Sequence, residues 1–277
     1  MNQKEIKQNI VDCVNRVKAE NPMAGSITNT VTINFVANAQ LAVGGSAAMV
    51  YLPDEAEGLA LAGNALYINV GTLFPVYSET LPRAAKTLHD AGKAWVLDPV
   101  AIGLGSMRTQ LLYDFKEYKP TIVRGNASEI ISLAKLWGLE EQGETGAVRG
   151  VDSTDTVEAA KDAAVQIARY TGGAAAVSGE TDLVTDGHMA VRSHGGSSFM
   201  PMITGAGCSL GGVTAVYATS ADPFTAALTA ANVYNLAGAR AEKDVPGPGS
   251  FQVRFLDELY RATPEEIANK PFEVEEL

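Results

Sequence analysis

The chain has 277 residues but only two cysteines, three histidines and two tryptophans. Cys13 and Cys208 lie far apart in the sequence, and Cys13 falls in an amphipathic helical pattern. A structural disulfide is therefore not expected, which favours a cytoplasmic protein. His89, His188 and His194 have no metal-ligand spacing, so we expect no zinc site.

Basic charge is also scarce. Lysine and arginine total 21 against 32 acids, giving a net charge of -11. An acidic chain is a poor partner for nucleic acid or for an anionic membrane surface. No run of about 18 uninterrupted apolar residues is present, and the N-terminal stretch Met1 to Ile6 is mostly polar, so we expect neither a transmembrane helix nor a signal peptide. The 46% of hydrophobic residues suffice for a sizeable core.

Short β-rich runs alternate with longer helical patterns along the chain. The predicted strands are Ala47 to Tyr51, Leu66 to Val70, Ala94 to Leu97, Thr121 to Val123 and Ala174 to Val177. The predicted helices between them are Val31 to Val43, Tyr77 to Ala91 and Asp155 to Tyr170, the last with a capping-box spacing of Asp155 and Glu158. This alternation predicts a three-layer α/β/α fold, in which a mostly parallel central sheet carries helices on both faces.

Two further patterns complete the fold prediction. Leu183 to Thr185 and His188 to Arg192 flank Asp186-Gly187, which predicts a β-hairpin and hence an antiparallel edge on the sheet. The C-terminal third reads as helices, of which Cys208 to Thr219 is apolar nearly all round and is expected to be buried.

The chain is expected to form one domain. Asp222 is placed to cap the next helix, with Pro223 at its first position. No linker rich in Pro or Gly and no internal repeat divides the sequence, so we assign residues 1–277 to a single domain.

Polar or flexible residues follow four of the predicted strands. They are Gly71-Thr72, Asp98-Pro99, Arg124-Gly125-Asn126 with Glu129, and Ser178-Gly179-Glu180. In open α/β sheets, ligands bind beyond the carboxyl ends of the strands. Acids with water suit Mg²⁺ and arginine suits phosphate, so this rim predicts a site for a phosphate with a metal ion.

Each of these residues also has a structural interpretation. Asp98 before Pro99 is a common turn former. Asn126 and Glu129 have the spacing of a capping box for the following helix. Arg124 at a strand end could form a surface ion pair. Their coincidence on one rim favours the functional interpretation.

The sharpest local feature is the Gly205-Ala206-Gly207-Cys208 turn before the buried helix. Glycine permits positive φ and close approach of a ligand, and free N–H groups at a helix start can hold an anion. We therefore expect these four residues to form an anion hole for a phosphoryl group in transfer. The turn is neither a Walker A loop nor a Rossmann fingerprint.

Two hypotheses concern the acceptor side of the reaction. At a helix start the dipole lowers a thiol pKa, so Cys208 could take a proton from a substrate hydroxyl. The alternative is a small buried hydrophobe. The stretch Gly25 to Phe35 could line a pocket for a small heteroaromatic ligand, or form a strand, a turn and a helix cap.

Several motifs occur in an order that is specific as a set. They are Ser26-Ile27-Thr28-Asn29, Asn69-Val70-Gly71-Thr72-Leu73, Leu97-Asp98-Pro99-Val100, Arg124-Gly125-Asn126-Ala127-Ser128-Glu129-Ile130, Gly179-Glu180-Thr181-Asp182, Thr204-Gly205-Ala206-Gly207-Cys208 and Gly247-Pro248-Gly249-Ser250-Phe251. Together they resemble the hydroxyethylthiazole kinase family, thiamine-salvage enzymes of the ribokinase-like fold. The resemblance runs from about Pro22 to Leu259.

The resemblance implies a reaction and a set of roles. The reaction is phosphorylation of 4-methyl-5-(2-hydroxyethyl)thiazole by ATP with Mg²⁺, in thiamine biosynthesis. The implied substrate-binding residues are Met49, Gly205, Asn29 and Gly71, and the implied ATP-binding residues are Arg124, Ser178 and Asn126. Asp98 and Glu129 are the implied metal ligands. Cys208 matches the position that faces the substrate hydroxyl, where the wider group usually has aspartate.

The resemblance also implies a homotrimer whose thiazole pockets lie between subunits, with Asn29 serving a neighbour's site. Ser178 departs from the threonine of many members but keeps the hydroxyl. Glu140 to Arg149 is expected to be a variable loop. Two other readings remain open: a different enzyme of the same fold, such as a hydroxymethylpyrimidine kinase, a sugar kinase or an ATP-dependent hydrate dehydratase, and a non-catalytic nucleotide- or thiazole-binding protein.

Overall fold

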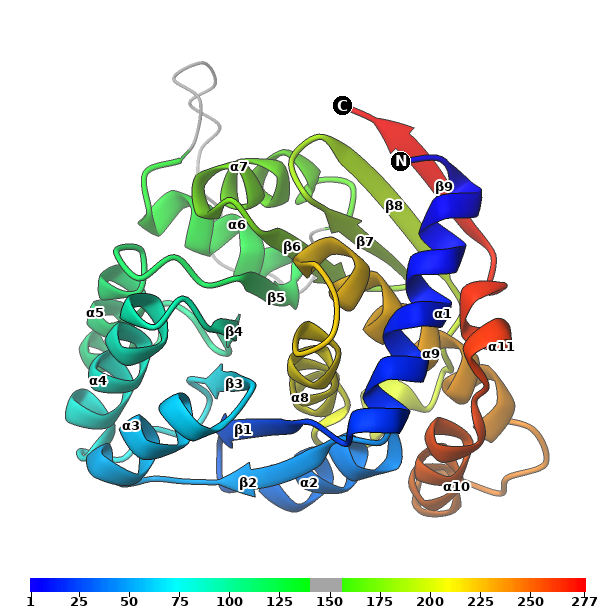
Figure 1. Ribbon diagram of the computed structural model, residues 1–277, viewed down its shortest axis with the longest axis horizontal. Helices are drawn as coiled ribbons and strands as arrows, with labels where there is room; N and C mark the ends of the chain where they lie inside the picture. The colour runs from blue at the N-terminus through cyan, green and yellow to red at the C-terminus, as the bar shows by residue number, and fades with distance from the viewer. Residues whose placement is uncertain (140–155) are drawn as a thin grey trace.

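The computed structural model describes residues 1–139 and 156–277, and its centre is a nine-stranded sheet (Figure 1). The strands lie in the order β2-β1-β3-β4-β5-β6-β7-β8-β9. Their bounds are β1 (Met23–Ile27), β2 (Ser46–Met49), β3 (Ala65–Asn69), β4 (Ala94–Asp98), β5 (Ile122–Asn126), β6 (Ala174–Ser178), β7 (Thr181–Thr185), β8 (Met189–His194) and β9 (Phe272–Glu276). The first six pair in parallel and the last three antiparallel.

Helices cover both faces, so the predicted mostly parallel α/β/α arrangement is confirmed. The outer face carries α3 (Pro53–Ala62), α4 (Tyr77–Asp90), α5 (Ser106–Asp114), α6 (Ala127–Leu136) and α7 (Lys161–Thr171). The inner face carries α1 (Gln3–Glu20), α2 (Ile33–Ala42), α8 (Ala206–Ala218), α9 (Pro223–Ala241), α10 (Pro248–Arg261) and α11 (Pro264–Ala268), with a short 3₁₀ helix at Met200–Met202. In Figure 1 the sheet curves around α8 and α9.

Alternation along the strands builds a core on each face. On β3, Leu66 and Ile68 are buried against the outer helices, whereas Tyr67 is buried against the inner ones. Successive side chains of a strand point to opposite faces, so a strand covered on both sides is apolar throughout. The two cores together hold the strand ends in fixed register.

Several predicted boundaries were displaced. β5 runs to Asn126 instead of ending at Val123, so Arg124 belongs to the strand. β2 ends at Met49, two residues before the predicted end. Helix α7 begins at Lys161, with no side-chain cap, instead of at Asp155. Asp155 and the expected loop at Glu140 to Arg149 lie outside the described residues.

The predicted hairpin is confirmed and is longer than expected. β7 and β8 pair antiparallel, with Thr185 opposite Ala190, and Gly187 in the turn has a φ of +88°. The predicted cap is also confirmed, because the Asp222 carboxylate accepts from the Thr225 N–H at 3.0 Å at the start of α9.

Two strands escaped prediction. β1 is a short strand whose three central residues, Ala24 to Ser26, are small, although a strand was the structural alternative for this stretch. Its Gly25 lies close to α3, since a Cβ there would lie 2.5 Å from the Leu59 side chain and would force that side chain to shift. β9 is the second missed strand. It carries Glu273, Glu275 and Glu276, and acidic residues are typical of an edge strand protected against pairing with other chains.

Both cysteines are free, as expected. Across the described ranges, no helix combines the length and the apolar character that crossing a bilayer requires.

Candidate active site

The carboxyl ends of the central strands meet the start of α8. Asn69 is the last residue of β3, Asp98 of β4 and Ser178 of β6. Asn69 lies opposite Asp98 in the β3–β4 pair. Because parallel strands end at one edge of the sheet, these polar side chains face the first turn of α8.

Asp98 and Arg124 form a buried ion pair at this edge. The Arg124 Nη1 lies 3.0 Å from Asp98 Oδ2, and the two side chains are 6% and 0% exposed. Burial works against the charge of Arg124, but the negative charge of Asp98 outweighs it and raises the pKa of Arg124. The surface ion pair proposed as the alternative for Arg124 is therefore wrong.

Arg124 also connects three elements. Its Nη1 donates to the Gly207 carbonyl of α8 at 3.0 Å, and its Nη2 donates to Ser178 Oγ at 2.6 Å. Its Nε has no hydrogen-bond partner among the described residues although it is buried. An arginine with an unused donor beside a serine hydroxyl can take an anionic oxygen.

Asp98 is held asymmetrically. Its Oδ2 accepts from Tyr67 Oη at 2.7 Å and from Asn69 Nδ2 at 3.1 Å, in addition to Arg124. Its Oδ1 is buried and has no partner in the part of the chain that the structure describes. Buried polar atoms normally have partners, so this oxygen is available to accept a water or to bind a cation.

Cys208 lies beside the same network. Asn29 Nδ2 and Asn69 Nδ2 each lie 3.3 Å from its Sγ. Burial, followed by the negative charge of Asp98, raises the pKa of the Cys208 thiol. The expected lowering of this pKa is therefore wrong, because a thiolate is unfavourable in a half-buried site next to a carboxylate.

Gly205 begins α8 in a left-handed conformation, with a φ of +95°. A Cβ on this residue would lie 2.9 Å from Thr32 Cγ2, so only glycine fits. The N–H groups of Gly205, Ala206, Gly207 and Cys208 have no hydrogen-bond acceptor within the described ranges, as expected for the start of a helix. The predicted turn therefore presents free donors close to Arg124.

Asn126 and Glu129 form the capping box of α6. Asn126 Oδ1 accepts from the Glu129 N–H at 2.9 Å, and Glu129 Oε2 accepts from the Asn126 N–H at 2.9 Å. The capping interpretation is thus confirmed. Burial and the nearby charge of Asp98 raise the pKa of Glu129.

These two carboxylates fit a divalent cation. Asp98 has an unused buried oxygen, and Asp98 and Glu129 lie close enough for the charge of one to affect the other. Among the described residues no cluster of three or more metal-ligating side chains occurs. Mg²⁺ usually takes one or two carboxylates plus waters and substrate phosphates, so two acids without a closed cage suit this ion.

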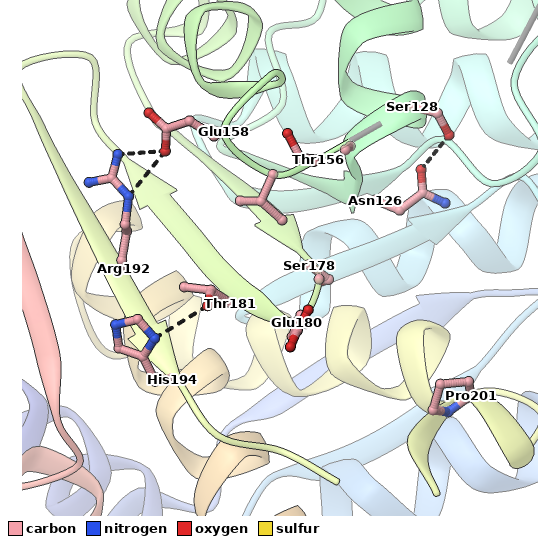
Figure 2. Close-up of a pocket in the computed structure, with 13 residues that line it drawn as sticks. Asn126, Ser128, Thr156, Glu158, Ser178, Glu180, Thr181, Arg192, His194 and Pro201 are labelled. Atoms are coloured by element: carbon pink, nitrogen blue, oxygen red, sulfur yellow. Dashed lines mark hydrogen bonds and ion pairs between the residues drawn. The ribbon is translucent and has the colours of Figure 1, made fainter. Parts of the chain in front are cut away.

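Two adjoining clefts open beside Ser178 and Gly179. The first, of about 890 Å³, is drawn in Figure 2, where Asn126 and Ser128 lie across from Ser178 and Glu180. The second, of about 870 Å³, reaches Ala206 and Gly207 of α8. Each has the size of a pocket for a nucleotide-sized ligand.

The first cleft has a rigid wall on β8. Figure 2 shows Arg192 paired with Glu158 and His194 with Thr181. Arg192 is also held by Glu275 of β9 at 2.8 Å. The C-terminal strand thus supports this wall.

The predicted substrate residues are only partly brought together. Gly71 lies at Asn29 and Asn69, since its N–H donates to Asn69 Oδ1 at 2.9 Å and a Cβ would lie 3.0 Å from Asn29 Nδ2. Met49 is the last residue of β2, separated from β3 by β1. Asn29 contacts Cys208 of its own chain, so its side chain already has a role within one subunit.

The sequence prediction missed four residues of the site. Asn69 lies in one of the family motifs, and Thr32 lies in the stretch proposed to line a pocket. Only the structure shows that Thr32 Oγ1 donates to Asn29 Oδ1 at 3.1 Å. Asp182, from the Gly179-Glu180-Thr181-Asp182 motif, accepts from the Gly179 N–H at 3.0 Å. Tyr67 carried no signal, because an aromatic residue within a strand is ordinarily core.

The sheet, the strand-end rim and the open start of α8 define a small-molecule kinase of the ribokinase-like class. A model of the Hydroxyethylthiazole kinase family matches residues 14–265. The chain belongs to this family.

Relatives support the family and the fold. The chain is 51% identical over 281 residues to a hydroxyethylthiazole kinase of Bifidobacterium longum subsp. infantis, covering 95% of this chain and 90% of that protein. The structure of a hydroxyethylthiazole kinase protein from Pyrococcus horikoshii OT3 superposes with a TM-score of 0.85 at 29% identity, covering 98% of this chain and 99% of that one. The pyridoxal kinase of Staphylococcus aureus in complex with AMP-PCP matches with a TM-score of 0.60 at 18% identity, over 92% of this chain and 99% of that one, and shares the fold.

Proposed function

We propose that this chain transfers a phosphoryl group from ATP to the hydroxyl of 4-methyl-5-(2-hydroxyethyl)thiazole, in thiamine biosynthesis or salvage. Membership of the family supports the choice of alcohol. The observation that carries the reaction type is the meeting of Cys208, the Asp98–Arg124 pair and the free N–H groups of α8 at one point.

The nucleotide would occupy the clefts beside Ser178, with its phosphates towards the strand ends. Arg124, Ser178 and Asn126 are proposed to bind it, because Ser178 and Asn126 line the first cleft and Arg124 donates to Ser178 Oγ. The pyridoxal kinase that shares the fold was solved with AMP-PCP, an ATP analogue, which is consistent with ATP here. Asp98 and Glu129 are proposed to hold Mg²⁺, which when bound offsets the negative charge of the phosphates.

The alcohol that accepts the phosphoryl group would lie on the side of Cys208 away from the nucleotide. Met49, Asn29, Gly71 and Gly205 are the proposed contacts of the thiazole. In the transfer, the acceptor oxygen bonds to the γ-phosphorus while the bond to the β,γ-bridging oxygen breaks, and ADP leaves with that electron pair. The hydroxyl proton passes to an oxygen of the transferred phosphoryl group. The N–H groups of Gly205 to Cys208 would hold the equatorial oxygens of the moving group.

Cys208 is proposed to orient the acceptor hydroxyl. A thiol whose pKa is raised by burial is protonated at neutral pH, so it is a weak base in the empty site. Acceptance of the hydroxyl proton by Cys208 would require a bound cation to lower that pKa, because the negative charge of a phosphate raises it. The loose transition state of phosphoryl transfer demands little deprotonation before attack, so orientation suffices for much of the role.

The test is ADP formation with a panel of alcohols and with three variants. We expect turnover with hydroxyethylthiazole and little with hydroxymethylpyrimidine, pyridoxal or sugars. Cys208→Ala is expected to lower kcat by about a hundredfold, the scale of a misplaced reacting group, and Cys208→Asp to retain more activity. Cys13→Ala is the matched control, because Cys13 is buried under α8 far from the strand ends.

Other results would lead elsewhere. Unchanged kcat in both Cys208→Ala and Cys208→Asp would remove Cys208 from the mechanism. Preferred turnover of another alcohol would reassign the substrate within the fold. Calorimetric binding of the thiazole without turnover would indicate a binding protein.

We also propose a cytoplasmic homotrimer with thiazole pockets at subunit interfaces. Two free cysteines favour a reducing compartment. Val31 and Met202 are exposed apolar side chains that flank, in sequence, the Asn29 and Gly205 segments, as expected at a contact between copies. Sedimentation equilibrium should give three times the chain mass, and a monomer at micromolar concentration would reject this assembly.

A further inference from the structure

The buried phenol of Tyr67 lies under the centre of the site. Tyr67 is the middle residue of β3, and its ring packs on the inner face of the sheet. Its hydroxyl donates to Asp98 Oδ2 at 2.7 Å and accepts from Asn69 Nδ2 at 2.8 Å. Both hydrogen-bonding capacities of the hydroxyl are used within the site.

This hydroxyl makes the shortest of the hydrogen bonds that distinguish the two oxygens of Asp98. Oδ2 receives three donors, from Tyr67, Asn69 and Arg124, at 2.7 to 3.1 Å. Oδ1 is buried and has no partner among the described residues. Three donors on one oxygen fix the plane of the carboxylate, so the other oxygen stays available for a ligand.

Space for the phenol comes from a glycine on α8. A Cβ on Gly211 would lie 2.3 Å from Tyr67 Cε2 and 2.7 Å from its Oη. Every other residue at this position would displace the ring. Glycine within a helix lowers its stability relative to alanine, so the contact with Tyr67 explains its presence in the middle of α8.

We propose that Tyr67 is a positioning residue that holds Asp98 with Oδ1 free for a divalent cation, and that Gly211 makes room for it. The proposal rests on the proposed function, because it concerns the metal–nucleotide site. Asn69 links this positioning to the acceptor side, since its Nδ2 lies near Tyr67, Asp98 and Cys208 alike. Tyr67 therefore connects the metal side of the site to the acceptor side.

The first experiment is Tyr67→Phe, which removes one hydroxyl and keeps the ring. Mg²⁺ is titrated calorimetrically into the protein with a nonhydrolysable ATP analogue, and kcat and KM are measured in parallel. We expect the affinity for Mg²⁺ to fall about tenfold, the scale for loss of a group that supports a metal ligand. We expect kcat to fall while the KM for the alcohol changes little.

Tyr77→Phe is the matched control. Tyr77 is buried on the opposite face of the sheet, and its hydroxyl has no partner among the described residues. The same chemical change there should leave the Mg²⁺ affinity and kcat at wild-type values. A loss of thermal stability without a change in Mg²⁺ affinity in Tyr67→Phe would mean that Tyr67 is only core, and the proposal would be overturned.

Gly211→Ala tests the same arrangement from the other side. Its methyl group displaces the phenol without removing the hydroxyl, so Mg²⁺ affinity should again fall. In the double variant the two losses should overlap, because both act through one hydrogen bond. Losses that add in full would contradict a shared cause.

The metal titration needs no turnover, so the two proposals can fail separately. A wild-type protein that binds Mg²⁺ with the nucleotide but phosphorylates no tested alcohol would reject the proposed substrate, while a tenfold shift in Tyr67→Phe would still support the role of Tyr67. Equal Mg²⁺ affinity in wild type and Tyr67→Phe would reject the role alone. A wild-type protein that neither binds Mg²⁺ with the nucleotide nor phosphorylates the thiazole would reject both.

Discussion

At the scale of single residues, the glycines of the site are explained by space and by backbone conformation. Gly205 needs both, because its φ is +95° and a Cβ would contact Thr32. Gly71 needs only space, between Asn69 and Asn29. A motif of glycines can be read from the sequence, but the neighbour that each one admits cannot.

Gly205→Ala should lower both stability and activity. The left-handed conformation costs a residue with a Cβ about 1 to 2 kcal/mol, and the contact with Thr32 adds to this. The free N–H groups of α8 would move with the displaced turn, so kcat should fall. Urea unfolding and ADP formation provide the two measurements.

Gly58→Ala is its control. Gly58 lies exposed in α3 without positive φ, and a Cβ at this position would have no neighbour within 4 Å. Alanine there should stabilise the protein by about 0.5 to 1 kcal/mol and leave kcat unchanged. A Gly205→Ala protein as stable and active as Gly58→Ala would show that the turn is not constrained.

The environment of Asp182, like that of Gly205, was not predicted from the sequence. Burial is the main cause that raises its pKa from 3.8 to about 6, against the hydrogen bonds from Gly179 and Asn235. Between these pH values the folded protein binds more protons than the unfolded chain. Its contribution to the free energy of unfolding therefore falls as the pH rises through this range.

Replacing Asp182 should remove this pH dependence. From pH 3.5 to pH 7, the wild type should lose stability relative to Asp182→Asn. The relative loss in unfolding free energy should be roughly 3 kcal/mol at most. Urea unfolding at several pH values measures the slope. Parallel profiles for the two proteins would show that Asp182 titrates normally.

At the scale of elements, two of the three helix caps expected from the sequence are confirmed, whereas α7 begins at Lys161 without a side-chain cap. Asp222 before Pro223 was expected to cap a helix, and it does so in α9. Asn126 and Glu129 have the capping-box spacing, and they form the box in α6. Such caps depend on residues three positions apart, so a short window of sequence contains them.

Asp222→Ala should cost about 1 kcal/mol of stability through loss of the cap on α9. This helix is buried along most of its length and contacts several strands, so the loss should lower the melting temperature of the whole protein. Asp222→Asn keeps an acceptor oxygen and should restore most of the loss. Equal melting temperatures for the alanine variant and wild type would show that the cap contributes nothing.

Strand boundaries were less predictable than caps. β5 extends through Arg124 to Asn126 because it pairs with β6 as far as Ser178. A charged residue, a glycine and an amide would ordinarily end a strand. The neighbouring strand supplies the hydrogen bonds that override this local preference.

At the scale of the whole molecule, segments far apart in sequence share the same cores. The inner core joins α1 and β1 to α8, α9 and α11, so the first and last thirds of the chain pack together. In Figure 1 the two ends of the chain lie near each other. We propose on this basis that residues 1–277 form one domain.

A single domain should unfold in one step. Trp95 and Trp137 are both buried in the outer core, so tryptophan fluorescence reports on that core. Far-ultraviolet circular dichroism reports on the helices of both faces. Urea transitions followed by the two signals should coincide within error. Separate midpoints would indicate that the faces unfold independently.

By itself, the sequence determined the alternation of strands and helices, the hairpin, the helix caps and the family, because each depends on short windows or on ordered motifs. It also indicated the rim residues, since parallel strands end at one edge. Only the tertiary structure decided that Arg124 is buried against Asp98, that the pKa of Cys208 is raised, and that Tyr67 meets the distant Gly211. The reason is physical: burial, electrostatic fields and contacts between distant segments are properties of the assembled fold and leave no local pattern.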